Sequence, residues 1–451
     1  MTTRVLVPSG VLGLGFDRAA LSRGVAMKPD IIAIDGGSTD SGPWSLGAGQ
    51  SKYSRAATKA EWRHLMQARA EAGVPLVIGT SGTCGADATV DWMYAITAEL
   101  AAELGQKLTV ARLYSQQPAR RVVQALEEGR VTPLTPAPGI DADGLRAMAN
   151  IVALGGVEQV QAAIATGADI ILCGRVTDTA TIAALPIARG EAVGGAWHGA
   201  KIAECGALCS TNPTSGVILV EFDETGFTVE AMAETALCTP HSVSAHMLYE
   251  NSDPFQLYEP GGYLDVRGAT YTALDARRVR VEGSKWVPGP YTVKLEGARA
   301  AGYQTTILAV LRQQHYVTHA QEWADKLHAF LTAQITERMG LTPPDYTLEF
   351  RMIGVNGALG ALENRQGQPA EVGVLGIVTA ATQEIAAEIG KLINPWVLHY
   401  PLTEDEELPT FAFPYSPATT DRGPLYEFAL NHVMALEDPM SAFRLTVSEV
   451  G

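Results

Sequence analysis

Short apolar runs alternate with longer amphipathic stretches over the first 180 residues, and this alternation limits the available folds more than any other feature. The stretches 57–73 and 88–105 carry apolar residues at three- and four-residue spacing, which is typical of amphipathic helices. Nearly continuous apolar strands that alternate with helices are buried on both faces, so the pattern predicts an α/β domain with a mostly parallel sheet over residues 1–215. The expected strands are RVLVPSG (4–10), DIIAIDGG (30–37), VPLVIGTSG (74–82), KLTVARLYS (107–115) and ADIILC (168–173).

The rest of the chain changes character in steps. Residues 216–300 contain short β-type runs joined by tight Gly and Asn/Asp turns, which predicts a mostly antiparallel, β-rich section packed on the first domain. Residues 301–402 show the order β-α-β-β-α-β, which predicts a ferredoxin-like domain with NPWVLHYPL (394–402) as its last strand. The tail, residues 403–451, carries one helix-like segment, LYEFALNHVMAL (425–436).

The chain is acidic, with a formal net charge of −16 over 451 residues. Nucleic acid and anionic membranes are therefore not expected as partners, because phosphate binding is driven by Lys and Arg. A small anionic organic substrate stays compatible with this charge, since it needs only a local pocket. The N-terminal stretch lacks the pattern of a signal peptide, no run reaches the ~20 apolar residues of a membrane helix, and the five cysteines are sparse, so we expect a reduced, cytoplasmic protein.

Glycine and small polar residues follow four of the five expected strands. Ligands of parallel α/β sheets bind at the carboxyl ends of the strands, which meet at one edge of the sheet. We therefore expect these loops to share one pocket. The loops are PSGVLGLG (8–15), DGGSTDSGP (35–43), GTSGTCGAD (79–87) and GRVTDTA (174–180).

The loop after the second strand is the first candidate site. Asp35 and Asp40 could act as acid, base or metal ligand, and the surrounding small residues could bind substrate; these are Gly36, Gly37, Ser38, Thr39 and Ser41. A turn that caps a helix would use the same residue types, so that alternative stays open.

The loop after the third strand enters an expected helix, whose free N–H groups could bind an anion through Ser81, Gly82, Thr83 and Cys84. Cys84 is either a thiolate at a positive helix end or a small buried thiol. Neither loop matches the dinucleotide or phosphate-loop motifs, so no nucleotide cofactor is predicted and the cofactor stays unknown.

Arg175 follows a buried strand and needs an anionic partner, which is either Asp178, another aspartate of the protein, or the substrate. Glu204 and His241 are further candidates for general acid–base chemistry, although a surface glutamate is the simpler reading of Glu204. A divalent metal bound by Asp35, Asp40 and Asp178 is an alternative use of the carboxylates.

Four segments carry a family resemblance: ADIILCGRVTDTATIAALPI, IAECGALCS, VSAHMLYENSDPFQLYEPGGYLDV and ARRVRVEGS. In this order they resemble the acyclic terpene utilisation (AtuA) family, and the resemblance extends from the first strand to about residue 312. It implies a catabolic enzyme for branched terpenoid acyl-CoA thioesters or other branched acids. It also implies a small ferredoxin-fold module, which would be a separate subunit here.

The sequence thus favours a lyase of the hydratase or dehydratase type that acts on a branched or dicarboxylic acid or its CoA thioester. Asp35 or Asp40 would transfer the proton, while Arg175 and the N–H groups of residues 79–85 would hold the carboxylate or enolate oxygen. Two alternatives remain: a magnesium-dependent isomerase or hydrolase, and a non-catalytic large subunit or scaffold for a small partner. We expect a homo-oligomer in each case.

Overall fold

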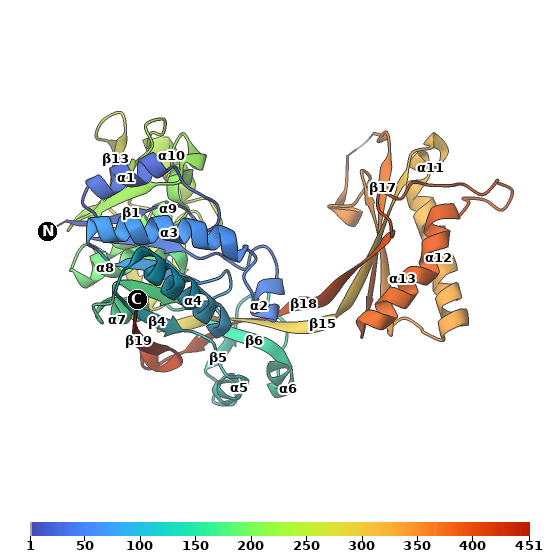
Figure 1. The fold of residues 1–451 in the computed structure, drawn as a ribbon, viewed down its shortest axis with the longest axis horizontal. Helices are drawn as coiled ribbons and strands as arrows, with labels where there is room; N and C mark the ends of the chain where they lie inside the picture. The colour runs from blue at the N-terminus through green and yellow to red at the C-terminus, as the bar shows by residue number, and fades with distance from the viewer. Residues whose placement is uncertain (1, 366) are drawn as a thin grey trace. The chain divides into compact units, whose positions relative to one another are not determined.

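The computed structural model describes residues 2–365 and 367–451. The chain forms two compact units, which are Met1–Arg299 with Phe428–Gly451, and Ala300–Glu427. Each is drawn in Figure 1. The tail of residues 403–451 is divided between the two units.

One large mixed sheet organises the first unit, and its centre is parallel as predicted. Each neighbouring pair of the five central strands is parallel, and the strands are almost fully buried. In spatial order these strands are β1 (Thr3–Val7), β2 (Ile31–Asp35), β3 (Leu76–Gly79), β7 (Ile170–Cys173) and β4 (Leu108–Tyr114).

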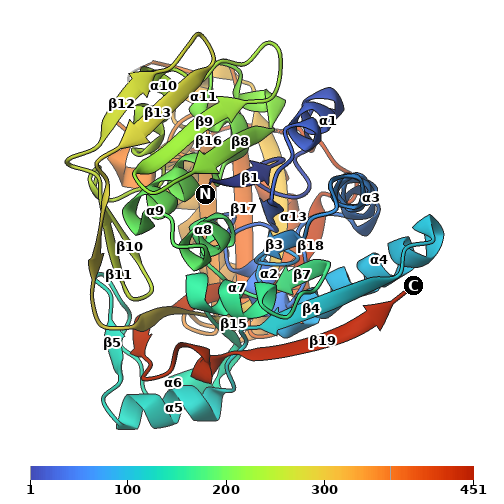
Figure 2. The same ribbon diagram turned by 90° about the vertical axis from the view of Figure 1, so that its left-hand side faces the viewer.

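Helices cover both faces of this central sheet (Figure 2). Trp62 and Leu65 of α3 and Trp197 of α9 are fully buried in the core. The helices α3 and α4 end at Gly73 and Gly105, which have positive φ, a conformation that glycine adopts without a Cβ penalty. One face carries α1 (Arg18–Ala26), α3 (Arg55–Ala72) and α4 (Asp87–Leu104), and the other carries α7 (Val157–Ile164), α8 (Asp178–Ala188) and α9 (Val193–Ala203).

Antiparallel strands extend the sheet on both sides. The β-rich section after residue 216 is antiparallel as predicted, and most of its strands continue the large sheet beyond β1. The extension consists of β8 (Ile218–Phe222), β9 (Gly226–Ala231), β13 (Arg278–Glu282) and β12 (Thr270–Ala273), and β19 (Arg444–Val450) pairs with β4 at the opposite edge. A smaller antiparallel sheet is made of β10 (Gln256–Glu259), β11 (Gly262–Asp265) and β14 (Lys285–Pro288).

The remaining elements of the first unit are short. Two of the strands, β5 and β6, pair with the long strands β18 (Thr419–Ala435) and β15 (Thr292–Leu311). The short elements are α2 (Trp44–Ala48), α5 (Ala119–Glu127), β5 (Val131–Pro133), α6 (Ala142–Arg146), β6 (Met148–Ala153) and α10 (Pro240–His246).

The second unit contains, in chain order from β15 to β18, a strand, two helices, two strands, a helix and a strand, and its strands lie in the order β16-β17-β15-β18. The ferredoxin-like domain expected over residues 301–402 stays a prediction. A core around Trp323 and Leu327 fills the space between this sheet and its helices. Besides β15 and β18, its elements are α11 (Gln314–Thr318), α12 (Ala320–Met339), β16 (Tyr346–Ile353), β17 (Val372–Ala380) and α13 (Gln383–His399).

Two segments near the C-terminus differ from the prediction. Residues 394–402 are not the last strand, because α13 continues to His399 and buries Ile389, Ile393 and Val397 at helical spacing. The expected helix at residues 425–436 is absent, because residues 425–435 belong to β18, where alternate residues from Leu430 to Met434 are buried. None of the helices in the described part of the chain is long and apolar enough to cross a membrane.

Candidate active site

A pocket of about 400 Å³ lies at the carboxyl ends of β1 and β2. Its walls come from the loops after these two strands, the start of α8, and the segments that follow α9 and α10. The polar residues that line it are Ser9, Asp35, Ser38, Asp40, Lys52, Asp178, Cys205, Thr214, Tyr249 and Glu250. Three of the four loops expected to share one pocket, 8–15, 35–43 and 174–180, contribute residues to it.

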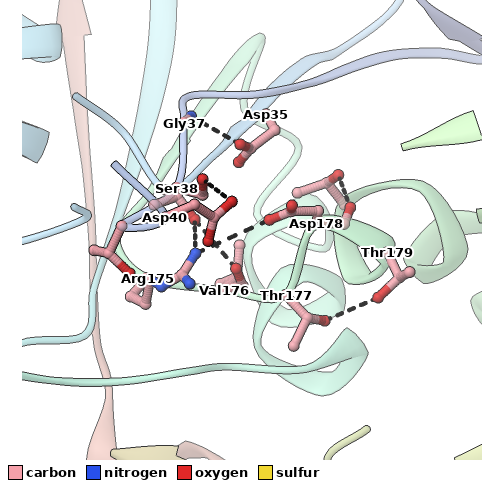
Figure 3. A network of polar contacts seen from close by, with 12 residues as sticks. Asp35, Gly37, Ser38, Asp40, Arg175, Val176, Thr177, Asp178 and Thr179 are labelled. Carbon is pink, nitrogen blue, oxygen red and sulfur yellow. Dashed lines mark hydrogen bonds and ion pairs between the residues drawn. The ribbon is translucent and has the colours of Figure 1, made fainter. Parts of the chain in front are cut away.

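Asp35 is the last residue of β2; it is buried and lines the pocket. The N–H of Gly37 donates a hydrogen bond of 2.8 Å to its Oδ2, whereas its Oδ1 has no partner among the described residues (Figure 3). Burial raises the pKa of Asp35 well above its ordinary value, and the neighbouring Asp178 adds to this effect while Arg175 opposes it. This shift favours the protonated form of the Asp35 carboxyl.

The rest of the same loop divides between the pocket and the interior. Ser38 lines the pocket and donates a 2.6 Å hydrogen bond to the exposed Asp40. Ser41 is exposed and accepts a 3.3 Å hydrogen bond from Lys52, which is the cation of the pocket lining. Thr39 is buried instead and points its hydroxyl at Glu296. No described residue accepts a hydrogen bond from the backbone N–H of Ser38, a residue that lines the pocket.

The loop of residues 79–85 lies beneath the β2 loop and does not line the pocket. Its backbone groups are used within the protein, because Thr83 donates to the carbonyl of Gly36 and Ser81 donates to that of Cys173. Gly82 and Thr83 both have positive φ, which indicates a tightly constrained turn. Two of the predicted anion-binding N–H groups, those of Ser81 and Thr83, are therefore used in contacts between loops.

Cys84 is fully buried in a small apolar cluster, and burial raises the pKa of its thiol. A raised pKa disfavours the thiolate, so this residue has the character of the small buried thiol.

Gly36 packs directly against the loop beneath it. A Cβ at this position would lie 2.5 Å from the carbonyl oxygen of Gly79 and 2.6 Å from that of Thr80. We expect Gly36→Ala to lower the free energy of unfolding by about 3 kcal/mol, because backbone atoms have little room to move. Gly139→Ala is the control, since no atom lies within 4 Å of its Cβ. Urea unfolding measures both, and equal midpoints would show that the loops are loosely packed.

Arg175 is paired with Glu296 rather than exposed to the pocket. Its Nε lies 3.1 Å from one oxygen of Glu296 and its Nη2 lies 3.3 Å from the other. Both side chains are only 9% exposed. Burial opposes the ionisation of Glu296, but Arg175 and Lys294 together outweigh burial and lower the pKa of this carboxyl. The main partner of Arg175 is thus a glutamate, which the sequence did not indicate, while Asp178, the partner named from the sequence, lies farther away at 4.0 Å.

Asp178 starts α8 and faces both the pocket and Arg175. Its Oδ1 lies 4.0 Å from Nη1 of Arg175, and one third of its side chain is exposed. Desolvation raises the pKa of Asp178 to about 6, while Arg175 and Lys201 oppose this shift. Asp35 and Asp178 thus lie near one buried guanidinium, and Asp40 lies near Asp178 (Figure 3).

Glu204 caps the C-terminal end of α9 and does not line the pocket. It forms a buried ion pair with Lys201. Burial raises the pKa of Glu204 to about 8, although Lys201 opposes the shift. Cys205, the next residue, reaches the pocket, and burial raises its pKa. Glu204 is therefore an internal group and not a surface glutamate.

His241 lies in the first turn of α10, where it is exposed and does not line the pocket. The buried histidine of this helix is His246, whose pKa burial lowers to about 4.

Several residues of this region were not predicted as site residues. Lys201 carries a signal that could have found it, because it is a lysine in a helix whose other residues, apart from His198, are apolar or glycine. Glu296 carries none, since its contact with Arg175 joins residues 121 positions apart. Glu259, at the end of β10, is buried and accepts a hydrogen bond from the hydroxyl of Thr179.

The raised pKa of Glu259 predicts that the free energy of unfolding depends on pH. Burial raises its pKa to about 7 in the folded protein, above the ordinary value of about 4.3 in an unfolded chain. The folded state then binds more protons between these values, so this group's stabilisation is present below pH 4 and is lost as the pH rises through 7. Replacing Glu259 by Gln removes the titration. We expect the variant to gain roughly 3 kcal/mol over the wild type between pH 5 and pH 8.

Urea unfolding at both pH values measures this difference. The matched control is Glu349→Gln, which changes an exposed glutamate. The control should keep the pH dependence of the wild type. Identical pH dependence in the Glu259 variant would show that this carboxyl ionises normally in the fold.

In the described residues, no group of three or more His, Cys, Asp or Glu side chains is arranged to hold a metal ion. The metal site proposed for Asp35, Asp40 and Asp178 stays a prediction that metal analysis of the purified protein can test.

The fold and the pocket define an α/β protein whose candidate ligand site lies at the ends of parallel strands. A family model described as "Acyclic terpene utilisation family protein AtuA" matches residues 48–405, and the chain belongs to this family. Membership suggests a catabolic role. The match starts later and ends later than the resemblance read from the motifs, so Asp35 and Asp40 precede it while Asp178 lies within it. Comparison with curated proteins and with solved structures gave no match.

Proposed function

We propose that the chain is a catabolic hydro-lyase that adds water to, or removes water from, a small carboxylic acid or its CoA thioester. The observation that carries this proposal is the pair of carboxyls on one pocket, where the pKa of Asp35 is raised well above its ordinary value and that of Asp178 is raised to about 6. Carboxyls with different proton affinities in one site supply an acid and a base at neutral pH.

In the dehydration direction, Asp178 accepts the proton from the carbon next to the carbonyl group. Asp35 gives its proton to the leaving hydroxyl, so that one C–H and one C–O bond break, a C=C bond forms and water leaves. Lys52 and the N–H of Ser38 bind the carboxylate or carbonyl oxygen of the substrate, where negative charge develops. Arg175 does not line the pocket, but its positive charge favours the ionised form of Asp178.

Ligand screening followed by isotope exchange tests the proposal. Short hydroxy acids, unsaturated acids and their CoA thioesters are first screened for a rise in the melting temperature, because a ligand that binds the folded state stabilises it. Compounds that bind are then incubated with the protein in D₂O and followed by NMR. Deuterium incorporation next to the carbonyl group, or interconversion of hydroxy and unsaturated acids, is expected. Binding without either reaction would contradict a hydro-lyase, and a parallel assay with chelator separates the metal-dependent alternative.

A further inference from the structure

A second pocket, of about 560 Å³, adjoins the start of α8. Thr177 lines it, whereas the next residue, Asp178, lines the first pocket. The walls are mostly apolar and consist of leucine, valine and proline side chains with the rings of Tyr258 and Tyr263. Its size lies within the range of about 300–1,000 Å³ that is usual for pockets that bind small organic molecules.

Glu259 is a buried carboxyl among the residues that line this pocket. It lines the pocket and is only 9% exposed, so nine tenths of it is buried. One carboxyl oxygen accepts a hydrogen bond from Thr179, but the other, Oε2, has no partner in the described structure. Buried polar atoms are almost always paired, so an unpaired one on a residue that lines a pocket is a position where a ligand can supply the missing hydrogen bond.

The charges around the pocket indicate which kind of ligand fits. Lys294 is the cation of the lining, and its Nζ already lies 3.5 Å from Oε1 of Glu296. A carboxylate ligand would lie against the carboxyl of Glu259, and an amine would have to share the pocket with Lys294. A neutral group avoids both repulsions. A hydroxyl or an amide can also donate to Oε2 or accept from it, whichever protonation state Glu259 has.

We propose that this second pocket binds a neutral ligand with an apolar body and one hydroxyl or primary amide group, which hydrogen-bonds to Glu259. The apolar body lies against the tyrosine rings and the leucine and proline side chains. This site is separate from the carboxyls of the first pocket, so the inference does not depend on the reaction proposed there.

Titration of the full-length protein with four six-carbon probes tests the proposal. Hexanamide and 1-hexanol carry the neutral groups, while hexanoate and hexylamine carry the same chain with a negative or a positive charge. We expect hexanamide and 1-hexanol to bind more tightly than the two charged probes in ligand-observed NMR. Failure of hexanamide to bind, or tighter binding of either charged probe, would overturn the proposal.

Variants assign the binding to this pocket. Glu259→Leu should weaken hexanamide binding about tenfold, whereas Glu259→Gln keeps a hydrogen-bonding group and should stay within about threefold of the wild type. Gly289→Phe fills the pocket and should abolish binding, since a Cβ there meets only the Cα of Gly262, at 3.7 Å, and the fold can accept it. Binding that survives Gly289→Phe would place the ligand elsewhere and overturn the inference, even if Glu259→Leu does not fold.

Discussion

Asparagine in place of Asp35 is expected to lower kcat by about a thousandfold on any substrate that the wild type turns over. The amide keeps an oxygen that can accept the 2.8 Å hydrogen bond from Gly37, but it has no acidic proton to give to a leaving hydroxyl. The variant should therefore fold normally and bind substrate while it fails in the proton transfer. Steady-state kinetics and a thermal melt measure the two effects separately.

Two further measurements sharpen this result. Asp143→Asn, whose side chain is 91% exposed, is the matched control and should keep full activity. In the wild type, kcat/KM should rise with pH through about 6 as Asp178 ionises. Full turnover by Asp35→Asn, or the same rising limb in Asp178→Asn, would remove these two residues from the mechanism.

Loss of the Glu296 side chain is expected to lower the free energy of unfolding by about 4 kcal/mol. In Glu296→Ala, Arg175 stays buried without the carboxylate that lies 3.1 Å from its Nε. Thr39 also loses the acceptor of its 3.3 Å hydrogen bond, and this bond holds the loop that follows Asp35 to Glu296. Urea unfolding measures the stability, and weaker ligand binding in the first pocket is expected to accompany the loss.

A double variant and a surface control identify the cause. Arg175→Met combined with Glu296→Leu removes both charges and should recover much of the stability, because no uncompensated buried charge remains. The control, Glu371→Ala, breaks an exposed pair with Arg312 and should cost less than about 1 kcal/mol. If Glu296→Ala cost no more than Glu371→Ala, the buried ion pair would not be important for the fold.

Local patterns predicted most of the elements that build the first unit. The five central strands and the helices α3 and α4 were recognisable because burial on a strand or along one helix face repeats with a short period in the sequence. The same reasoning failed at residues 394–402 and 425–436, where the local pattern suits either state. There the tertiary contacts decide: α13 buries Val397 against its own sheet, and β18 pairs with neighbouring strands.

The sequence by itself determined that Asp35 and Asp178 stand at one edge of the first unit's sheet, since Asp35 ends one strand, Asp178 follows another, and the carboxyl ends of parallel strands meet at one edge. Only the tertiary structure decided what each polar group does there. It paired Arg175 with Glu296, buried the loop of Cys84 away from the pocket and left one oxygen of Glu259 without a partner. Ion pairing and desolvation depend on distances between segments that lie far apart in the chain, and residue spacing within one segment carries no information about those distances.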